Sequence, residues 1–270
     1  MISAGVDIGS TTTKVVLLDA DTVRTSLVVP TGSLPGETAR RAFEEALGRA
    51  GIAGRKVDVI ATTGYGRRLA DFGDMVMTEI KACAIGARLA ETPDGPVYTV
   101  IDVGGQDTKV VALGDDGEVE DFSMNDKCAA GTGRFLEMLA AKLGLAYEEF
   151  VAEALTSDTM LQMNATCAVF AESEVVGLLA RKVSRADVAA AAHNAIASRI
   201  GSMARRVGRR GAYCFVGGGA RNGALVRALE DVLSHPLYVP PDAQAVVALG
   251  AAVGAQRRLE RTDGKEGELQ

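Results

Sequence analysis

Short apolar runs, each followed by glycine, serine or threonine, divide the first half of the chain into predicted strands. Residues 5–19 read GVDIGSTTTKVVLLD, which predicts a strand, a turn and a second strand rich in β-branched residues. Residues 100–113 read VIDVGGQDTKVVAL and predict the same three elements. A third strand is predicted after each copy, over 23–29 and 119–123. The chain therefore contains two predicted triplets of strands.

The two triplets are related in sequence. When Asp7 is aligned with Asp102 and Leu18 with Leu113, 7 of 12 positions are identical: the aspartate, a glycine, a threonine, the lysine, two valines and the final leucine. Repetition of this kind is typical of a duplicated structural unit.

Helical sequence follows each triplet. Helices are predicted over 36–50, 79–91, 131–143 and 168–179, with a longer one beginning near Arg185. His193 lies off the apolar stripe of that last helix, which predicts a solvated side chain. A short buried strand over 213–216 then leads through three glycines into an amphipathic helix.

Strand triplets that alternate with helices, present twice, predict two related α/β domains with a cleft between them. The best boundary is the Pro-Asp-Gly-Pro stretch that begins at Pro93. We therefore expect a first half over residues 1–95 and a second half over 96–256. The remaining residues, 257–270, are rich in charge and predict a frayed tail.

Composition narrows the class of protein. The 270 residues carry a net charge of −6, which argues against sequence-independent nucleic-acid binding, because that needs an excess of Lys and Arg. No apolar run approaches the roughly 20 residues of a membrane span, and the first residues lack the pattern of a signal peptide. These features predict a cytoplasmic protein that binds neither nucleic acid nor membrane.

The repeated turns are candidates for phosphate binding. A turn of glycine, serine and threonine presents several N–H groups and hydroxyls to one point, which suits a phosphate chain. Two such turns, one in each half, predict a site for ATP or ADP lined by Ser10, Thr11, Thr12, Thr13, Lys14, Gly104, Gly105 and Gln106. The alternative is that Gly9 and Gly104 only permit tight hairpins.

Catalytic roles are predicted for three residues near these turns. Asp7 and Asp102 end the strands that precede the turns, where carboxylates could hold waters of a Mg²⁺ ion. Gln106 stands where the first copy has Thr11, so it could orient the attacking water. The alternative for both aspartates is that they satisfy N–H groups of the turns.

A third glycine cluster completes a set of three loops. Gly218, Gly219 and Asn222 follow the strand over 213–216 and would let the backbone lie against an adenosine. The order DIGSTTTK, DVGGQDTK and VGGGARN resembles that of the superfamily of actin, sugar kinases and heat-shock 70 ATPases. The resemblance implies an α/β protein with a duplicated actin-like (ribonuclease H-like) ATPase fold, whose two domains flank a nucleotide cleft.

The four cysteines are too sparse for a disulfide scaffold. Cys83 and Cys214 have apolar neighbours and are typical of core thiols, whereas Cys128 and Cys167 are predicted near helix N-termini, which favour a thiolate. A [4Fe–4S] cluster needs four thiolates, which a two-fold homodimer would supply from two per chain. A Zn²⁺ site and four unrelated thiols remain alternatives, and spacing alone favours the latter.

The sequence around the cysteines carries a more specific resemblance. NDKCAAGTGRFLE and TCAVFAESEV, with ATTGYGRR and GGQDTK, resemble the activators (component A, or archerase) of 2-hydroxyacyl-CoA dehydratases. Their family also holds the ATPase subunits of benzoyl-CoA reductases and the reductases of double-cubane cluster proteins. The resemblance extends from about Gly5 to Ala255.

The resemblance implies a function and a set of partners. It implies a homodimer that holds one [4Fe–4S] cluster between its subunits, with Cys128 and Cys167 as the ligands from each. ATP would drive an electron from this cluster to an iron–sulfur dehydratase or reductase, and ferredoxin or flavodoxin would be the electron source. Gln244, in DAQAVVALGAA, would be a further nucleotide contact, although a capping or surface amide is an equal alternative.

Two other functions share these features. A sugar or acid kinase of the same fold would leave the cysteines incidental, but it needs a general base for the substrate hydroxyl, and the chain has only two histidines. A non-enzymatic scaffold, in which the nucleotide only switches a dimer contact, is the third possibility.

Overall fold

The computed structural model describes residues 1–52, 57–159, 161–163, 168–208 and 211–267. The chain divides into two compact units. Unit 1 comprises residues 1–96, 113–119 and 244–270, and unit 2 comprises residues 97–112 and 120–243. The first division between the units, after residue 96, thus lies beside the boundary predicted after residue 95. Residues 244–270, which the sequence divides between the second half and the tail, belong to unit 1.

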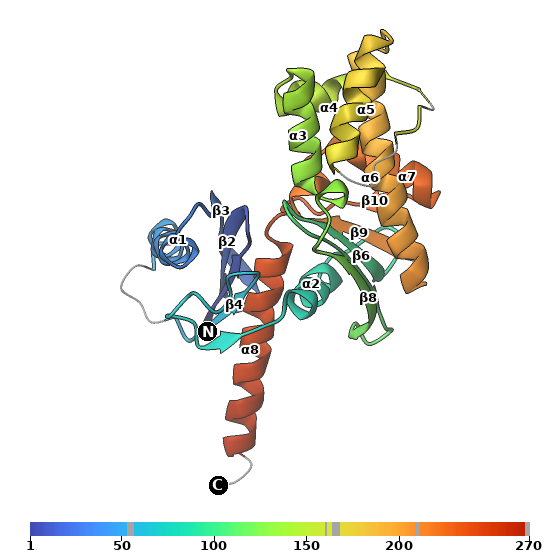
Figure 1. Ribbon diagram of the computed structural model, residues 1–270. Helices are drawn as coiled ribbons and strands as arrows, with labels where there is room; N and C mark the ends of the chain where they lie inside the picture. The colour runs from blue at the N-terminus through green and yellow to red at the C-terminus, as the bar shows by residue number, and fades with distance from the viewer. Residues whose placement is uncertain (53–56, 160, 164–167, 209–210, 268–270) are drawn as a thin grey trace. The chain divides into compact units, whose positions relative to one another are not determined.

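Unit 1 contains a five-stranded mixed sheet in the order β3-β2-β1-β4-β5 (Figure 1). Its strands are β1 (Ile2–Ile8), β2 (Thr12–Asp19), β3 (Thr22–Pro30), β4 (Val59–Thr63) and β5 (Met75–Val76). The first three are antiparallel neighbours, and β4 pairs parallel with both β1 and β5.

Alternation along β2 explains why the sheet of unit 1 is covered on both faces. Val15 and Leu17 pack in the cluster that contains α1 (Pro35–Arg49), whereas Val16 and Leu18 pack against α8 (Val246–Gly267). Successive strand residues point to opposite faces, so this run of apolar residues serves two layers. Figure 1 shows α1 and α8 on opposite sides of the sheet.

Small residues bring α8 close to its neighbours. A Cβ on Gly5 of β1 would overlap the Ala248 carbonyl, and a Cβ on Gly250 would overlap the carbonyl of Ala82 in α2 (Glu79–Arg88). The helix therefore packs closely on both β1 and α2. It continues to Gly267, through most of the segment for which the sequence predicts a frayed tail.

Unit 2 repeats the five-stranded arrangement, in the order β10-β9-β6-β7-β8. Its strands are β6 (Val97–Val103), β7 (Thr108–Leu113), β8 (Val119–Asn125), β9 (Ala212–Val216) and β10 (Leu237–Tyr238). β6 pairs antiparallel with β7 and parallel with β9, as β1 does with β2 and β4. The sequence repeat is thus a repeat of sheet topology.

The helices of unit 2 form its main core. They are α3 (Gly133–Leu143), α4 (Tyr147–Thr156), α5 (Ala168–Ala180), α6 (Arg185–Val207) and α7 (Gly223–Leu233), with short 3₁₀ turns η1 (Ala129–Gly131) and η2 (Gly218–Arg221). In Figure 1, α3, α4, α5 and α7 lie around α6, and each of them contacts it. This arrangement surrounds α6 with apolar neighbours.

Candidate functional site

The first loop, residues 9–14, joins β1 to β2 and is fixed by backbone and threonine hydrogen bonds. The Gly9 N–H donates to the Thr12 carbonyl over 3.1 Å. Thr31, just beyond β3, donates its N–H to the Thr11 carbonyl over 2.9 Å and its hydroxyl to the Gly9 carbonyl over 2.8 Å. The Thr13 and Thr31 hydroxyls are 2.9 Å apart. Ser10 and Thr12 remain partly exposed at this turn, and Thr11 is exposed.

Asp7 lies at the end of β1 beside the first loop and is 5% exposed. Its Oδ2 is 3.0 Å from the Lys14 Nζ. Gly64 follows β4 with φ of +89°, and a Cβ there would lie 2.5 Å from both Asp7 Oδ1 and the Ile8 carbonyl oxygen. Gly64 thus leaves the space that the carboxylate occupies. The partly buried pair of Asp7 and Lys14 places one anion and one cation beside the turn.

The second loop, residues 104–109, repeats this geometry in unit 2. The Gly104 N–H donates to the Asp107 carbonyl over 2.9 Å. Asp102 is 5% exposed, and its Oδ2 is 3.5 Å from the Lys109 Nζ, which also lies 2.7 Å from Asp107. Gln106 is exposed at the turn, and Gly105 is partly exposed. The two loops differ because Lys109 faces two carboxylates.

A glycine with positive φ also adjoins Asp102. Gly217 follows β9 with φ of +83°, and a Cβ there would overlap Asp102 Oδ1 and lie 2.6 Å from the Val103 carbonyl oxygen. Gly64 and Gly217 therefore occupy corresponding places after the parallel strands β4 and β9. In the sequence, Gly217 is only one member of a glycine cluster and Gly64 has no predicted role, because a sequence does not show which strand will lie beside β1.

Three further candidates for nucleotide contacts differ in accessibility. Gly218 is exposed in η2, whereas Gly219 is buried. Gln244 is partly buried in the turn before α8, in unit 1.

Asn222 is 1% exposed and lies inside unit 2. Its Oδ1 accepts from the Leu225 N–H over 3.0 Å and caps α7, while its Nδ2 is 2.9 Å from the Tyr147 hydroxyl and 3.0 Å from His193 Nε2. These contacts join α4, α6 and α7. We therefore leave Asn222 out of the proposed nucleotide contacts.

The prediction that His193 is solvated is wrong. The side chain is 1% exposed, its ring stacks on Phe150 with centroids 4.9 Å apart, and Nδ1 lies 2.7 Å from the Ala189 carbonyl. Burial disfavours the charged imidazolium and lowers the pKa of His193 to about 4. The prediction failed because α6 is covered by helices on the face that the pattern assigned to solvent.

Cys128 lies between β8 and α3. The sequence predicts it near the N-terminus of a helix over 131–143, but α3 begins at Gly133, and Cys128 instead precedes the short turn η1. Asn125 Nδ2 donates to the Cys128 carbonyl over 2.9 Å, and Arg199 Nη1 lies 3.2 Å from the Cys128 Sγ. The thiol is partly buried. Cys167 lies outside the described residues.

The other two cysteines are buried, in agreement with their prediction as core thiols. Cys214 lies in β9, and burial raises the pKa of its thiol to about 12. A thiol with so high a pKa remains protonated at neutral pH, which does not suit a metal ligand.

Hydrogen bonds connect the second loop directly to the cysteine segment, which we define as residues 125–134. The Thr108 hydroxyl donates to the buried Gly131 carbonyl over 2.6 Å. The Gly133 N–H donates to the Gly104 carbonyl and the Arg134 N–H to the Gly105 carbonyl, both over 3.0 Å. These three hydrogen bonds hold the second loop and the cysteine segment together.

Exposed apolar side chains of unit 2 gather near the two cysteines in the sequence. Phe122 and Met124 on β8 are 50% and 41% exposed. Phe170 and Val176 on α5 are 69% and 52% exposed. Large exposed apolar side chains of this kind are typical of a surface that a partner covers.

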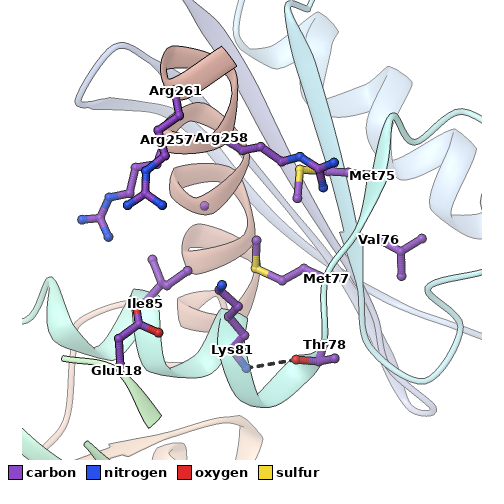
Figure 2. Close-up of a pocket in the computed structure, with 11 residues that line it drawn as sticks. Met75, Val76, Met77, Thr78, Lys81, Ile85, Glu118, Arg257, Arg258 and Arg261 are labelled. Carbon is purple, nitrogen blue, oxygen red and sulfur yellow. Dashed lines mark hydrogen bonds between the residues drawn. The ribbon is translucent and has the colours of Figure 1, made fainter. Parts of the chain in front are cut away.

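Unit 1 also contains a pocket of about 410 Å³ (Figure 2). Its walls come from β5, the start of α2 and the later turns of α8. Lys81, Arg257, Arg258 and Arg261 line it, together with Glu118 and apolar residues that include Met75 and Met77. The pocket contains no residue of the two loops.

Comparison with known proteins assigns the chain to a family. The model of the BadF/BadG/BcrA/BcrD ATPase family matches residues 4–255. The chain belongs to this ATPase family. Within the described part of the chain, no helix is long and apolar enough to cross a membrane.

The relatives of this protein include dehydratase activators, which confirms the resemblance seen in the sequence. A 2-hydroxyisocaproyl-CoA dehydratase activator from Clostridioides difficile is 36% identical over 259 residues, covering 94% of this chain and 95% of that protein. The solved activator of the 2-hydroxyisocaproyl-CoA dehydratase from Clostridium difficile, with bound ADPNP, has a TM-score of 0.89 and 34% identity, covering 98% of each chain.

The predicted fold class is also confirmed. A ROK hexokinase from Thermus thermophilus has a TM-score of 0.54 at 17% identity, covering 97% of this chain and all of the other. This likeness concerns the fold alone. This protein therefore has the actin-like α/β fold, with two five-stranded mixed sheets.

Proposed function

We propose that the protein is an ATP-dependent one-electron donor. In this proposal a homodimer holds one [4Fe–4S] cluster and reduces an iron–sulfur partner enzyme, a 2-hydroxyacyl-CoA dehydratase. The observation that carries the proposal is the hydrogen-bonded connection from the second loop to the cysteine segment, through Thr108, Gly104 and Gly105. It provides a path along which nucleotide binding can act on Cys128.

ATP and Mg²⁺ would be bound through the two loops. In the first loop, the N–H groups and hydroxyls of Ser10, Thr11 and Thr12 would face the phosphates. In the second loop, the N–H of Gly105 would face them, while the N–H of Gly104 holds the turn through Asp107. Thr13 fixes the turn through Thr31. The remaining proposed contacts are Lys14, Gly218, Gly219 and Gln244.

Hydrolysis would depend on positioning and electrostatics. Asp7 and Asp102 are proposed to hold waters of Mg²⁺, since each carboxylate is fixed by a lysine and by the space that a glycine leaves. Gln106 is exposed at its turn and is proposed to orient the attacking water.

Cys128 has the chemistry that a cluster ligand requires. Its thiol is only partly buried, and the Arg199 guanidinium 3.2 Å from the sulfur would balance the charge of a thiolate. Among the described residues, no three His, Cys, Asp or Glu side chains converge. As the resemblance to dehydratase activators implies, the proposed ligand set combines Cys128 and Cys167 of both subunits. The cluster held by these cysteines would supply the site that takes up and gives off one electron.

The exposed apolar side chains support a homodimer. Phe122, Met124, Phe170 and Val176 would be removed from water at an interface around the cysteines. A two-fold axis there brings each cysteine near its own copy. Ferredoxin or flavodoxin is the proposed electron source.

ATP-dependent electron transfer tests the proposal. The anaerobically reconstituted protein is reduced with titanium(III) citrate, freed of excess reductant and mixed with an oxidised 2-hydroxyisocaproyl-CoA dehydratase. We expect dehydration activity only when MgATP is present, and none with Cys128→Ser. A protein that stays colourless under these conditions and instead phosphorylates a sugar would support the rival kinase function.

A further inference from the structure

Arg199 is held close to Cys128 by its surroundings. It lies on α6 between Ile196 and Ile200, both fully buried, so the backbone that carries it is fixed in the core of unit 2. Its Nη1 donates to Cys128 Sγ over 3.2 Å, across 71 residues of sequence. Because nitrogen–sulfur hydrogen bonds are long, this distance represents a direct contact.

Gly131 provides the space through which the arginine side chain passes. A Cβ on Gly131 would lie 2.8 Å from Arg199 Cδ and 2.6 Å from Asn125 Nδ2. Asn125 in turn holds the Cys128 carbonyl, and Thr108 holds the Gly131 carbonyl. The sulfur and the carbonyl of Cys128 are thus each held by a polar side chain, and the intervening backbone is held by the second loop.

We infer that Arg199 is a positioning residue for the Cys128 sulfur and that it raises the reduction potential of the group which this sulfur binds. The inference rests on the proposed function, because it assumes that Cys128 is a cluster ligand. A one-electron reduction adds one negative charge, and a guanidinium hydrogen-bonded to a ligand sulfur stabilises the more negative state. Hydrogen bonds to ligand sulfurs are among the features that set cluster potentials.

The test is a redox titration of the reconstituted dimer, followed by the EPR signal of the reduced cluster. Arg199→Met removes the charge and the donor. At a fixed solution potential we expect the ratio of oxidised to reduced cluster to rise about tenfold, the order of effect of one hydrogen bond to a charged group. Tenfold corresponds to a potential about 59 mV more negative for a one-electron couple. Arg199→Lys keeps a cation, so its potential should lie between those of the wild type and Arg199→Met.

Arg205→Met provides the matched control, because Arg205 lies on the same helix but is exposed and donates to Ser202 over 3.1 Å. This variant should titrate like the wild type. An Arg199→Met dimer that titrates like the wild type would overturn the inference. A folded Arg199→Met protein that loses its cluster, while Arg205→Met and Arg199→Lys retain theirs, would support the positioning role.

Failure of the inference and failure of the proposed function give different results. If the wild-type protein takes up no cluster under reconstitution, the proposed function fails and Cys128 is not a ligand. If wild type and Arg199→Met both carry a cluster with the same potential, the proposed function stands and the role of Arg199 is wrong.

Discussion

Thr108→Val tests the connection between the second loop and the cysteine segment. The substitution keeps the β-branched shape but removes the hydroxyl that donates to the Gly131 carbonyl over 2.6 Å. Both residues are buried, so the carbonyl is left without this donor in a place that water does not reach. An unsatisfied buried polar group costs about 1–3 kcal/mol. For a chain of 270 residues, the melting temperature should fall by about 2–5 °C.

Thr99→Val is the matched control within unit 2. Thr99 on β6 is equally buried, but its hydroxyl has no hydrogen-bond partner among the described residues. Removing an unpartnered hydroxyl should leave the melting temperature unchanged or raise it. Thermal unfolding followed by circular dichroism measures the melting temperatures of both variants. Equal melting temperatures for Thr108→Val and Thr99→Val would refute the importance of the connection.

The same variant has a functional consequence. If the second loop acts on Cys128 through Thr108, the Thr108→Val protein should still hydrolyse ATP but transfer fewer electrons for each ATP consumed. The ratio of the two rates measures this coupling. An unchanged ratio in Thr108→Val would show that nucleotide binding acts on the cysteine segment by another path.

Three further predictions concern the site, the interface and the core. Gly64→Ala and Gly217→Ala should each weaken MgATP binding at least tenfold in calorimetry, since a Cβ would displace Asp7 or Asp102. Gly95→Ala is the control: Gly95 has a similar φ of +90° but open space around it, so this variant should bind MgATP normally. Phe170→Asp should convert the dimer to monomers in analytical ultracentrifugation and reduce the bound iron; a dimer that keeps its iron would exclude Phe170 from the interface. His193 has a pKa of about 4 in the folded state against 6.5 in the unfolded chain. Between these pH values the unfolded chain takes up a proton that the folded chain does not. About 3 kcal/mol of stability should therefore be lost as the pH falls from 6.5 to 4. NMR titration of the His193 ring checks this, and a midpoint near 6.5 would contradict it.

The loops were predictable because their pattern is local and occurs twice. The aspartate before each turn, the glycine within it and the lysine after it recur at the same spacing, and the structure shows both hairpins with that aspartate and lysine in contact. The sequence also predicts α1, α2, α3, α5, α6 and α7 to within a few residues, and the apolar stripe is clearest in α6 and α7.

Residues distant in sequence could not be placed in the same way. Thr31, Gly64 and Arg199 take part in the site only because β3, β4 and α6 pack where they do. No helix was predicted over α8, because its contacts depend on glycine and alanine, which give little amphipathic signal. His193 was misplaced because the sequence pattern does not show how many helices cover α6.

The most direct test of the proposed function is the iron and sulfide content of the anaerobically reconstituted dimer, measured for the wild type and for cysteine variants. A bridging [4Fe–4S] cluster predicts about four irons and four sulfides per dimer. It predicts none in Cys128→Ser or Cys167→Ser, and the wild-type amount in Cys83→Ser. Wild-type protein without iron, or a full cluster in both Cys128→Ser and Cys167→Ser, would contradict it.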